Sequence, residues 1–388
     1  MGKVRVLFIL SALQRNGAVL STLTTMKHLD PARYEPALFV LERRDEPWHE
    51  LLEGVSVTYG VSKGKPGAQH VPQVFAKLLR TARRSDVIVG GLEMAPTFLA
   101  IIAAKLTGKP SVGFVRNSLP EHLAQMPARY KTLTKFIYPH LTRAVAISEG
   151  IKESVTRLVP QLEGRTRTVY IPLDIAKTQA RSREGVPGAD AARPYVLAVG
   201  RLEYQKGFDL LLRAYAQLKA SEPALRHRLV LVGQGKAKAK LVALVQELGL
   251  ADDVVMPGFQ ENPYAWMDKA EVFVSSSRYE GFCRVIAEAL AVGTPVVATD
   301  CPSGPAEVLQ EGYYGVLVEN ENPDALAEGV RSLLCDPARL QTLRERGPSR
   351  AADFTPEATV ERFESVLAEV LPSLPEPFGI EDSVTPPQ

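Results

Sequence analysis

Two glutamates, Glu280 and Glu288, lie eight positions apart in the stretch SSSRYEGFCRVIAEALAVGTPVVATDC, residues 275–301. The stretch predicts the end of a strand, a turn at Gly281 and a helix from about Cys283 to Val292. Free N–H groups at a helix start, beside a glycine that lets a ligand approach, bind anions. Glu280 lies at the mouth of such a site, and Glu288 could accept hydrogen bonds from a sugar diol. Together they suit a nucleotide-sugar, although an acid near a helix start is also favoured by the helix dipole alone.

Two cations upstream have matching chemistry. In AVGRLEYQKGFDLLL, residues 198–212, a strand ends at Gly200, and Arg201 and Lys206 follow in the loop before Gly207. Arginine offers a planar fork and lysine a point charge, so the two could clamp a diphosphate. Negative charge grows on the phosphates as a nucleotide leaves, and such cations stabilise that transition state most. Taken alone, the same two residues would be interpreted as solvated loop cations.

The elements that must position these residues alternate along the chain. Strands are predicted at KVRVLFIL, PALFVL, VSVTYG, DVIVG, SVGFV, RAVAIS and TVYI, then at PYVLAVG, RLVLVG, DVVMPG, AEVFVSS, PVVAT and GVLVEN. Amphipathic helical segments separate many of them. Mostly apolar strands alternating with helices predict parallel sheets covered on both faces, with ligands at the carboxyl ends of the strands. The predicted fold class is α/β, with two doubly wound Rossmann-like domains.

The domain limits follow from changes in composition. Residues 1–174 form the predicted N-terminal domain and 194–371 the C-terminal domain, whose last helix is left free to pack back on the first. Residues 175–193 lack periodicity and are rich in Gly, Pro and charge, which predicts a linker. The Pro-rich tail, residues 372–388, is predicted to be disordered.

The cysteines and the apolar runs indicate the cellular compartment in which the protein is expected. The three cysteines form no CxxC pair or metal spacing, so a reduced cytoplasmic compartment is expected. The apolar opening MGKVRVLFILSAL is interpreted as a buried first strand and not as a signal peptide. No apolar run reaches the roughly 20 residues of a membrane span.

Charge is unevenly distributed. Residues 1–174 hold 24 Lys and Arg against 14 Asp and Glu, a net charge of +10, whereas the remainder holds 22 against 30, a net of −8. The clusters Arg80/Arg83/Arg84 and Arg129/Lys131/Lys135 contribute to the basic half. They are interpreted either as solvated faces or as a peripheral contact with the anionic inner face of the cytoplasmic membrane. Nucleic acid is not an expected partner, because no aromatic-interleaved basic stretch is present.

The two motifs together resemble the family 4 retaining glycosyltransferases of the GT-B fold. The hallmark of that family is a glutamate, seven residues and a second glutamate, here Glu280 to Glu288, preceded by a GR…KG loop, here Gly200–Arg201 and Lys206–Gly207. ATDCPSGPAEVL, residues 298–309, resembles members that build lipopolysaccharide, capsule and polyprenol-linked glycans. The resemblance implies two domains facing across a cleft. It also implies transfer of a hexosyl or N-acetylhexosaminyl group from a nucleotide-sugar, with UDP expected first, to a glycan or lipid-linked acceptor hydroxyl. Retention of configuration, no cofactor and no obligatory metal are implied as well.

The resemblance also implies roles by position. Glu280, Arg201 and Lys206 would be catalytic: Glu280 would contact the transferred sugar and the two cations would hold the diphosphate. Glu288 would bind the ribose. The remaining implied donor-site positions are Gly17, Gly200, Gly233, Phe259, Gly281, Phe282, Cys283 and Arg284. Among these, the backbone N–H groups of residues 282–284 would contact phosphate or sugar. The loops at Gly233 and Phe259 would lie at the edge of the base pocket. Gly17 would be the glycine turn of the first domain.

The acceptor side allows two interpretations. Family members often carry a histidine after a middle strand of the first domain, and here the strand SVGFV is followed by Arg116 and Asn117, with His122 further on. Either Arg116 and Asn117 take that place or His122 reaches back. The first interpretation is favoured, with Arg116 and Asn117 lining the cleft.

Three other functions fit the sequence less well. A catalytically silent sugar-nucleotide-binding or scaffold subunit would be favoured by loss of Glu280 or Lys206, and both are present. A nucleotide-sugar epimerase of similar build would need acidic and histidine groups for proton removal, and no such set can be placed. A dinucleotide oxidoreductase is disfavoured because no GxGxxG follows the first strand.

Overall fold

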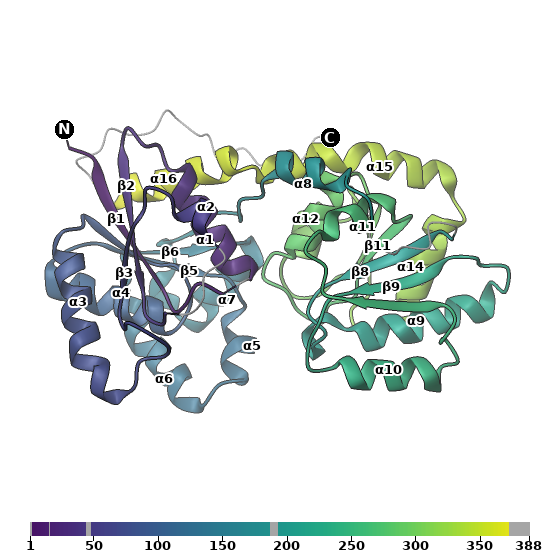
Figure 1. Cartoon of the computed structure of the whole chain (residues 1–388), viewed down its shortest axis with the longest axis horizontal. Helices are drawn as coiled ribbons and strands as arrows, with labels where there is room; N and C mark the ends of the chain where they lie inside the picture. The colour runs from purple at the N-terminus through teal and green to yellow at the C-terminus, as the bar shows by residue number, and fades with distance from the viewer. Residues whose placement is uncertain (1, 15, 44–47, 187–192, 372–388) are drawn as a thin grey trace. The chain divides into compact units, whose positions relative to one another are not determined.

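The strands of the computed structural model, which describes residues 2–14, 16–43, 48–186 and 193–371, form two separate parallel sheets (Figure 1). Each sheet belongs to its own compact unit. Unit 1 contains the described residues up to Ile147, then Ile151–Pro172 and the described residues from Pro356 onward. Unit 2 contains Ser148–Gly150 and Leu173–Thr355. The prediction of two doubly wound α/β halves is confirmed.

Unit 1 has a sheet of seven parallel strands in the order β3-β2-β1-β4-β5-β6-β7. The strands are β1 Val4–Leu10, β2 Tyr34–Val40, β3 Ser56–Tyr59, β4 Val87–Gly90, β5 Ser111–Val115, β6 Arg143–Ala146 and β7 Thr166–Thr168. The helices are α1 Gly17–His28, α2 His49–Leu52, α3 Val71–Arg83, α4 Ala95–Thr107, α5 Leu119–Ala124, α6 Ala128–Ile137, α7 Glu149–Leu158 and α16 Pro356–Val370, with short 3₁₀ turns at Ala68–His70, Tyr138–His140 and Pro160–Leu162.

Strand β1 shows why most strands of this sheet are rich in apolar residues. Successive side chains point to opposite faces of a sheet. Leu7 and Ile9 pack in a core with residues of α3 and α4, whereas the ring of Phe8 lies 6.1 Å from that of Phe363 in α16. Because helices cover both faces, no position from Val6 to Leu10 meets water, and the alternation of apolar and polar residues disappears there.

Unit 2 has a sheet of six parallel strands in the order β10-β9-β8-β11-β12-β13. The strands are β8 Tyr195–Val199, β9 Arg228–Val232, β10 Val254–Gly258, β11 Val272–Ser275, β12 Val296–Thr299 and β13 Val316–Val318. The helices are α8 Ile175–Ser182, α9 Phe208–Ser221, α10 Lys238–Glu247, α11 Pro263–Lys269, α12 Arg284–Ala291, α13 Pro305–Val308, α14 Pro323–Leu334 and α15 Pro337–Ala351, with 3₁₀ turns at Tyr204–Lys206 and Ala352–Phe354. Helices α9 and α10 lie on one side of the sheet, and α11 and α12 on the other (Figure 1).

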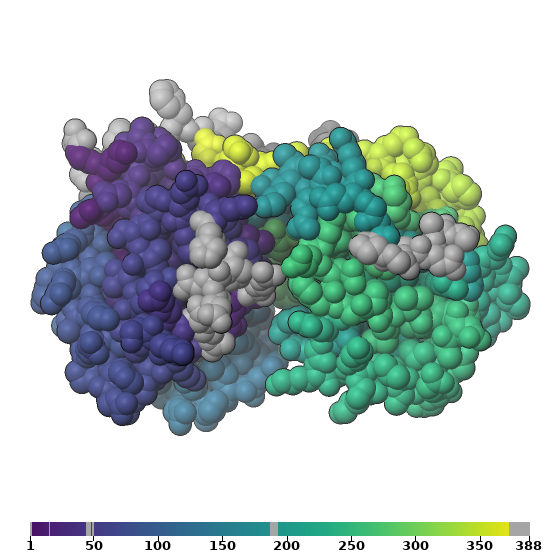
Figure 2. Space-filling view, viewed as in Figure 1, coloured from purple at the N-terminus to yellow at the C-terminus, as the bar shows by residue number. Residues whose placement is uncertain are grey.

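The predicted linker is wrong in part, because residues 175–182 form helix α8. Asp174 caps this helix by accepting a hydrogen bond from Lys177 N at 2.9 Å. Gln179 Nε2 donates to the carbonyl of Ala291 at 2.9 Å, which ties α8 to α12. Figure 2 shows the teal surface of α8 lying against the green surface of unit 2. Residues 187–192 of the predicted linker and the predicted tail 372–388 lie outside the described residues.

The last helix, α16, groups with unit 1, although it follows unit 2 in the chain. Glu364 accepts a hydrogen bond from Asp30 N at 2.7 Å, and Glu369 pairs with Arg143 at 2.8 Å and with Arg167 at 2.9 Å. Over the described ranges, no helix combines the length and apolar character that crossing a bilayer requires.

Candidate active site

The strand order of unit 2 determines where a site forms. Strand β8 begins the sheet, β9 and β10 add on one side, and β11 to β13 add on the other. The loops that follow β8 and β11 therefore leave the sheet at neighbouring carboxyl ends, in the crevice where open α/β sheets bind ligands. These loops carry the GR…KG motif and the first glutamate, so residues some seventy positions apart meet at one place.

Gly207 allows the two loops to come into contact. Its φ of +60° lies in the left-handed region, and a Cβ at this position would stand 1.9 Å from the carbonyl oxygen of Ser276. Ser276 Oγ donates in return to the carbonyl of Lys206 at 2.9 Å. Only glycine combines this conformation with so close an approach.

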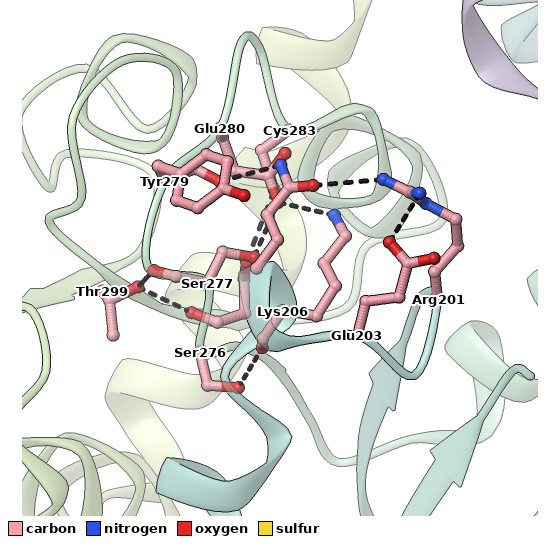
Figure 3. Close-up of polar contacts among 11 residues, drawn as sticks. Arg201, Glu203, Lys206, Ser276, Ser277, Tyr279, Glu280, Cys283 and Thr299 are labelled. Carbon is pink, nitrogen blue, oxygen red and sulfur yellow. Dashed lines mark hydrogen bonds and ion pairs between the residues drawn. The ribbon is translucent and has the colours of Figure 1, made fainter. Parts of the chain in front are cut away.

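Lys206 and Glu280 form a buried ion pair (Figure 3). Nζ of Lys206 lies 2.5 Å from Oε1 of Glu280, and the two side chains are 15% and 8% exposed. Ser277 Oγ donates to the same oxygen at 2.6 Å, and Thr299 Oγ1 holds the Ser277 carbonyl at 2.6 Å. Burial acts to lower the pKa of Lys206, but the Glu280 carboxylate outweighs it and raises that pKa, so the lysine stays charged.

Arg201 lies at the exposed rim of the same site. Its Nη1 pairs with Glu203 at 2.7 Å and its Nη2 donates to Gln205 Oε1 at 3.1 Å. Gln205 Nε2 in turn donates to the carbonyl of Tyr279 at 3.0 Å, which links the loop after β8 to the loop after β11. In Figure 3 the charged ends of Arg201 and Lys206 lie on the same side of Glu280. The structure thus brings the three residues together.

Helix α12 carries the second glutamate. It begins at Arg284, one residue later than predicted, because Cys283 takes a left-handed conformation with φ 61° and ψ 62°. Phe282 is buried and packs edge-on against Phe354, with ring centroids 5.0 Å apart. Glu288 lies one turn into the helix and is buried. The turn through Gly281 and Phe282 therefore fixes the start of α12 beside Glu280.

Cys283 is not an activated nucleophile. Its thiol is buried, and its Sγ lies 3.4 Å from Ser275 Oγ. Burial raises the pKa of Cys283 to about 12, which leaves the reactive thiolate almost absent at neutral pH.

Two further predicted donor positions lie at adjacent strand ends. Gly233 follows β9 with φ +145°, and a Cβ there would stand 1.8 Å from the carbonyl oxygen of Gly200, which follows β8. Gly233 N donates to the Gly258 carbonyl at 2.9 Å, at the end of β10. Phe259, the next residue, is 54% exposed. The ends of β8, β9 and β10 thus form one continuous edge beside the site, and the exposed Phe259 follows the last of them.

Of the candidates in unit 1, Gly17 is the first residue of α1, whose start is capped by Asn16 through a 2.9 Å hydrogen bond from Val19 N. His122 lies within α5 and is half-buried. Asn117 is the second residue after β5, and its backbone N–H donates to Glu93 Oε1 at 2.7 Å.

Arg116 is buried and its guanidinium is engaged within unit 1. Its Nε donates to the Gly91 carbonyl at 3.0 Å, Nη1 to Ser21 Oγ at 2.6 Å and Nη2 to Thr22 Oγ1 at 2.8 Å. Its backbone N–H donates to Glu93. Burial lowers the pKa of Arg116 to about 10, partly offset by Glu93. Arg116 therefore ties α1 to the loops after β4 and β5.

Sequence reasoning missed Glu93, which is buried and holds both Arg116 and Asn117. The available signal was its place three residues after the strand DVIVG, at the carboxyl edge where functional groups gather.

Two family models match the chain. The model of the Glycosyl transferases group 1 matches residues 182–350, and that of Glycosyltransferase Family 4 matches residues 15–177. A Campylobacter jejuni protein named N-acetylgalactosamine-N,N'-diacetylbacillosaminyl-diphospho-undecaprenol 4-alpha-N-acetylgalactosaminyltransferase is 30% identical over 269 residues, which are 67% of this chain and 70% of the relative. D-inositol 3-phosphate glycosyltransferase 1 of Catenulispora acidiphila is 32% identical over 351 residues, 82% of each chain.

Solved structures are similar over nearly the whole chain. The crystal structure of Anabaena HepE in complex with UDP superposes with a TM-score of 0.80 and 22% identity, covering 96% of this chain and 100% of that one. At this identity the likeness establishes the fold, which is that of the two-domain GT-B enzymes.

Proposed function

This chain is a member of the family 4, group 1 glycosyltransferases, and on that premise we propose that it is a sugar transferase. It moves the sugar of a UDP-sugar to an acceptor hydroxyl and retains the configuration of the transferred sugar. The observation that carries the proposal is the buried ion pair of Lys206 and Glu280 at the junction of β8 and β11, with Arg201 at its rim. Cations and carboxylates at one strand edge are what a donor with phosphates and hydroxyls requires.

The proposed roles follow the geometry of unit 2. Arg201 and Lys206 bind the diphosphate and stabilise the charge that grows on it as the bond to the sugar breaks. Glu280 accepts hydrogen bonds from the transferred sugar, and Glu288 accepts them from the ribose. Gly233 and Phe259 lie at the edge of the pocket for the base. The N–H groups of residues 282–284 donate hydrogen bonds to phosphate or sugar oxygens.

The proposed reaction proceeds without an obligatory metal or other cofactor, because the two cations neutralise the leaving diphosphate. The leaving phosphate oxygen takes the proton of the acceptor hydroxyl, and the acceptor oxygen forms its bond on the face that the diphosphate leaves. Catalysis then comes from positioning and charge stabilisation. In unit 1, Gly17 is proposed to be a phosphate-binding turn at the start of α1, and Asn117 and His122 are proposed to bind the acceptor with the loop that Arg116 ties down.

UDP is proposed as the nucleotide because the similar Anabaena protein was solved with UDP and with UDP-glucose. A hexose or an N-acetylhexosamine is the proposed sugar. Relatives named for a diphospho-undecaprenol substrate and for the lipopolysaccharide core support a lipid-linked or cell-envelope glycan as acceptor.

A lipid-linked acceptor would require the enzyme to work at a membrane, and α6 supports this. The helix carries the basic residues Arg129, Lys131 and Lys135, all exposed. Phe136 is 72% exposed and Leu133 40% exposed. Exposed apolar side chains among basic ones suit the surface of an anionic bilayer. Peripheral attachment to the inner face of the cytoplasmic membrane is therefore part of the proposal.

The proposal is tested by a binding panel of UDP, GDP and ADP, followed by a transfer assay with the matching nucleotide-sugars. A ligand at 100 times its dissociation constant adds about 2.7 kcal/mol to the free energy of unfolding, which a thermal shift detects. UDP is expected to bind best, and transfer or slow hydrolysis of a UDP-sugar is expected to depend on Glu280. Binding without transfer or hydrolysis of any sugar would instead indicate a silent binding subunit.

A further inference from the structure

Arg284, the first residue of α12, is paired with Glu288 one turn further along the same helix. Its Nε lies 2.7 Å from Oε1 of Glu288. Tyr264 in α11 donates its hydroxyl to the same oxygen at 3.4 Å. The Glu288 side chain is 7% exposed and that of Arg284 is 18% exposed. Donors from two different helices therefore fix one carboxylate oxygen of a buried glutamate.

The fold alone does not account for an arginine at this position. A cation in the first turn meets the positive end of the helix dipole, which is unfavourable. Nη1 of Arg284 is also buried and has no hydrogen-bond partner among the residues that the structure describes. A buried donor left unpaired costs free energy, so an arginine present only for stability would be expected to have its donors satisfied. Stability alone therefore does not explain the arginine, and what it supplies at this position is its contact with Glu288.

The second carboxylate oxygen of Glu288, Oε2, is left for a ligand. Both side-chain donors meet Oε1, and within the described residues no side chain donates to Oε2. An ionised carboxylate accepts about four hydrogen bonds through its two oxygens. With Oε1 held, the carboxylate cannot turn freely, and Oε2 keeps one orientation.

We propose that Arg284 is the positioning residue for Glu288, holding its carboxylate so that Oε2 accepts hydrogen bonds from the ribose hydroxyls of the donor nucleotide. This inference rests on the proposed function, because it requires that the site bind a nucleoside diphosphate. It goes beyond that function by assigning the selectivity for ribose over deoxyribose to Arg284, with Tyr264 as the second support.

The test measures the affinity of wild type and Arg284→Met for UDP and for 2′-deoxy-UDP by calorimetry, with GDP and ADP and their 2′-deoxy forms in reserve should the panel favour another base. A hydrogen bond to a charged group is worth roughly ten- to a hundredfold in affinity, so the wild type is expected to prefer the ribonucleotide by that factor. Arg284→Met is expected to bind the ribonucleotide about tenfold more weakly and to prefer it by less than about threefold.

Four further variants make the result decisive. Glu288→Gln should lose the same ribose preference, which shows the effect that Arg284→Met is expected to match. Arg284→Lys and Tyr264→Phe change the support more mildly and should give intermediate preferences even if Arg284→Met fails to fold. Arg331→Met removes a comparable Arg–Glu pair from the exposed face of α14, where Arg331 Nε lies 2.7 Å from Glu328, and should leave the preference unchanged.

Each outcome decides the matter. A wild-type preference that Arg284→Met, Arg284→Lys and Tyr264→Phe all retain would overturn the role of Arg284 and leave the proposed function intact, since the nucleotide would still bind. An equal loss of affinity for both nucleotides would also overturn it, because the arginine would then act on the phosphates. If the wild type binds none of the three nucleoside diphosphates, the proposed function fails and this inference fails with it.

Discussion

Lys206 and Glu280 lie 74 positions apart, and yet their charged atoms meet at 2.5 Å in the interior of unit 2. The contact joins the loop after β8 to the loop after β11. Breaking a buried ion pair by removing one partner leaves an uncompensated charge, so the pair couples the stability of the site to its function. A donor phosphate would offer Lys206 a second anionic partner.

Glu280→Gln tests this coupling. The variant keeps the shape of the side chain but leaves Lys206 without its countercharge, so the free energy of unfolding should fall by about 3 kcal/mol. UDP should still bind within tenfold of wild type, because its phosphates pair with Lys206, whereas transfer should fall by roughly a hundredfold or more. Chemical denaturation, calorimetry and a transfer assay measure the three quantities. Transfer at the wild-type rate would rule out Glu280 as a group that acts on the sugar.

Gly207→Ala tests the contact between the two loops. A Cβ 1.9 Å from the Ser276 carbonyl forces the loops apart, and the free energy of unfolding should fall by about 3 kcal/mol or more. Gly249→Ala is the matched control, because Gly249 has φ +68° but its Cβ would meet no atom within 4 Å. That variant should lose only the 1–2 kcal/mol or so of left-handed strain. Equal losses in the two variants would show that the close approach contributes nothing.

Thiol labelling tests the burial of the cysteines. Burial raises the pKa of Cys283 to about 12 and also raises that of Cys301, whereas Cys335 is exposed. At pH 8 one thiol should react in the folded protein and all three in denaturant. Because the folded pKa of Cys283 lies above that of a free thiol, near 8.5, the stability that depends on its neutral form is present below about pH 8.5 and is lost as pH rises toward 12. Rapid labelling of Cys283 in the native state would contradict the described packing of α12.

Charge reversal on α6 tests the proposed membrane contact. Lys131→Glu/Lys135→Glu should weaken binding to vesicles containing anionic lipid by roughly 30-fold or more at low salt, since each basic residue near such a surface contributes about 1 kcal/mol. Lys236→Glu/Lys240→Glu in unit 2 makes the same change of charge at exposed lysines and should have little effect. Co-sedimentation measures both. Equal weakening by the two variants would show that net charge, and not α6, causes the binding. If the wild type does not bind the vesicles at low salt, the proposed membrane contact is wrong.

Much of the fold could be predicted from the sequence because most strands are apolar on both faces and are separated by glycine-containing or polar turns. Helix α8 was missed because its stability comes from distant partners. Thr178 and Ser182 are buried there, and Gln179 reaches the carbonyl of Ala291. Small polar residues buried by tertiary contact leave no helical pattern of apolar positions.

The same limit applies to the sites. The spacing of Glu280 and Glu288 and the GR…KG loop are local patterns, so the sequence alone was enough to identify them. Arg116 was expected to line a cleft, but its partners Ser21 and Thr22 lie more than ninety positions away, and their approach depends on sheet order. Glu93 has only its place after a strand as a local signal and Tyr264 has none, since each acquires its role from the residue that it meets.

The most direct test of the central claim compares UDP with UMP as ligands of wild type and of Arg201→Met. Arg201 is 63% exposed, so its replacement should leave the fold intact. If the paired cations grip the diphosphate, the wild type should bind UDP at least about a hundredfold more tightly than UMP, and Arg201→Met should reduce that ratio by about tenfold. An unchanged ratio in Arg201→Met, or equal affinity of the wild type for UDP and UMP, would contradict the claim.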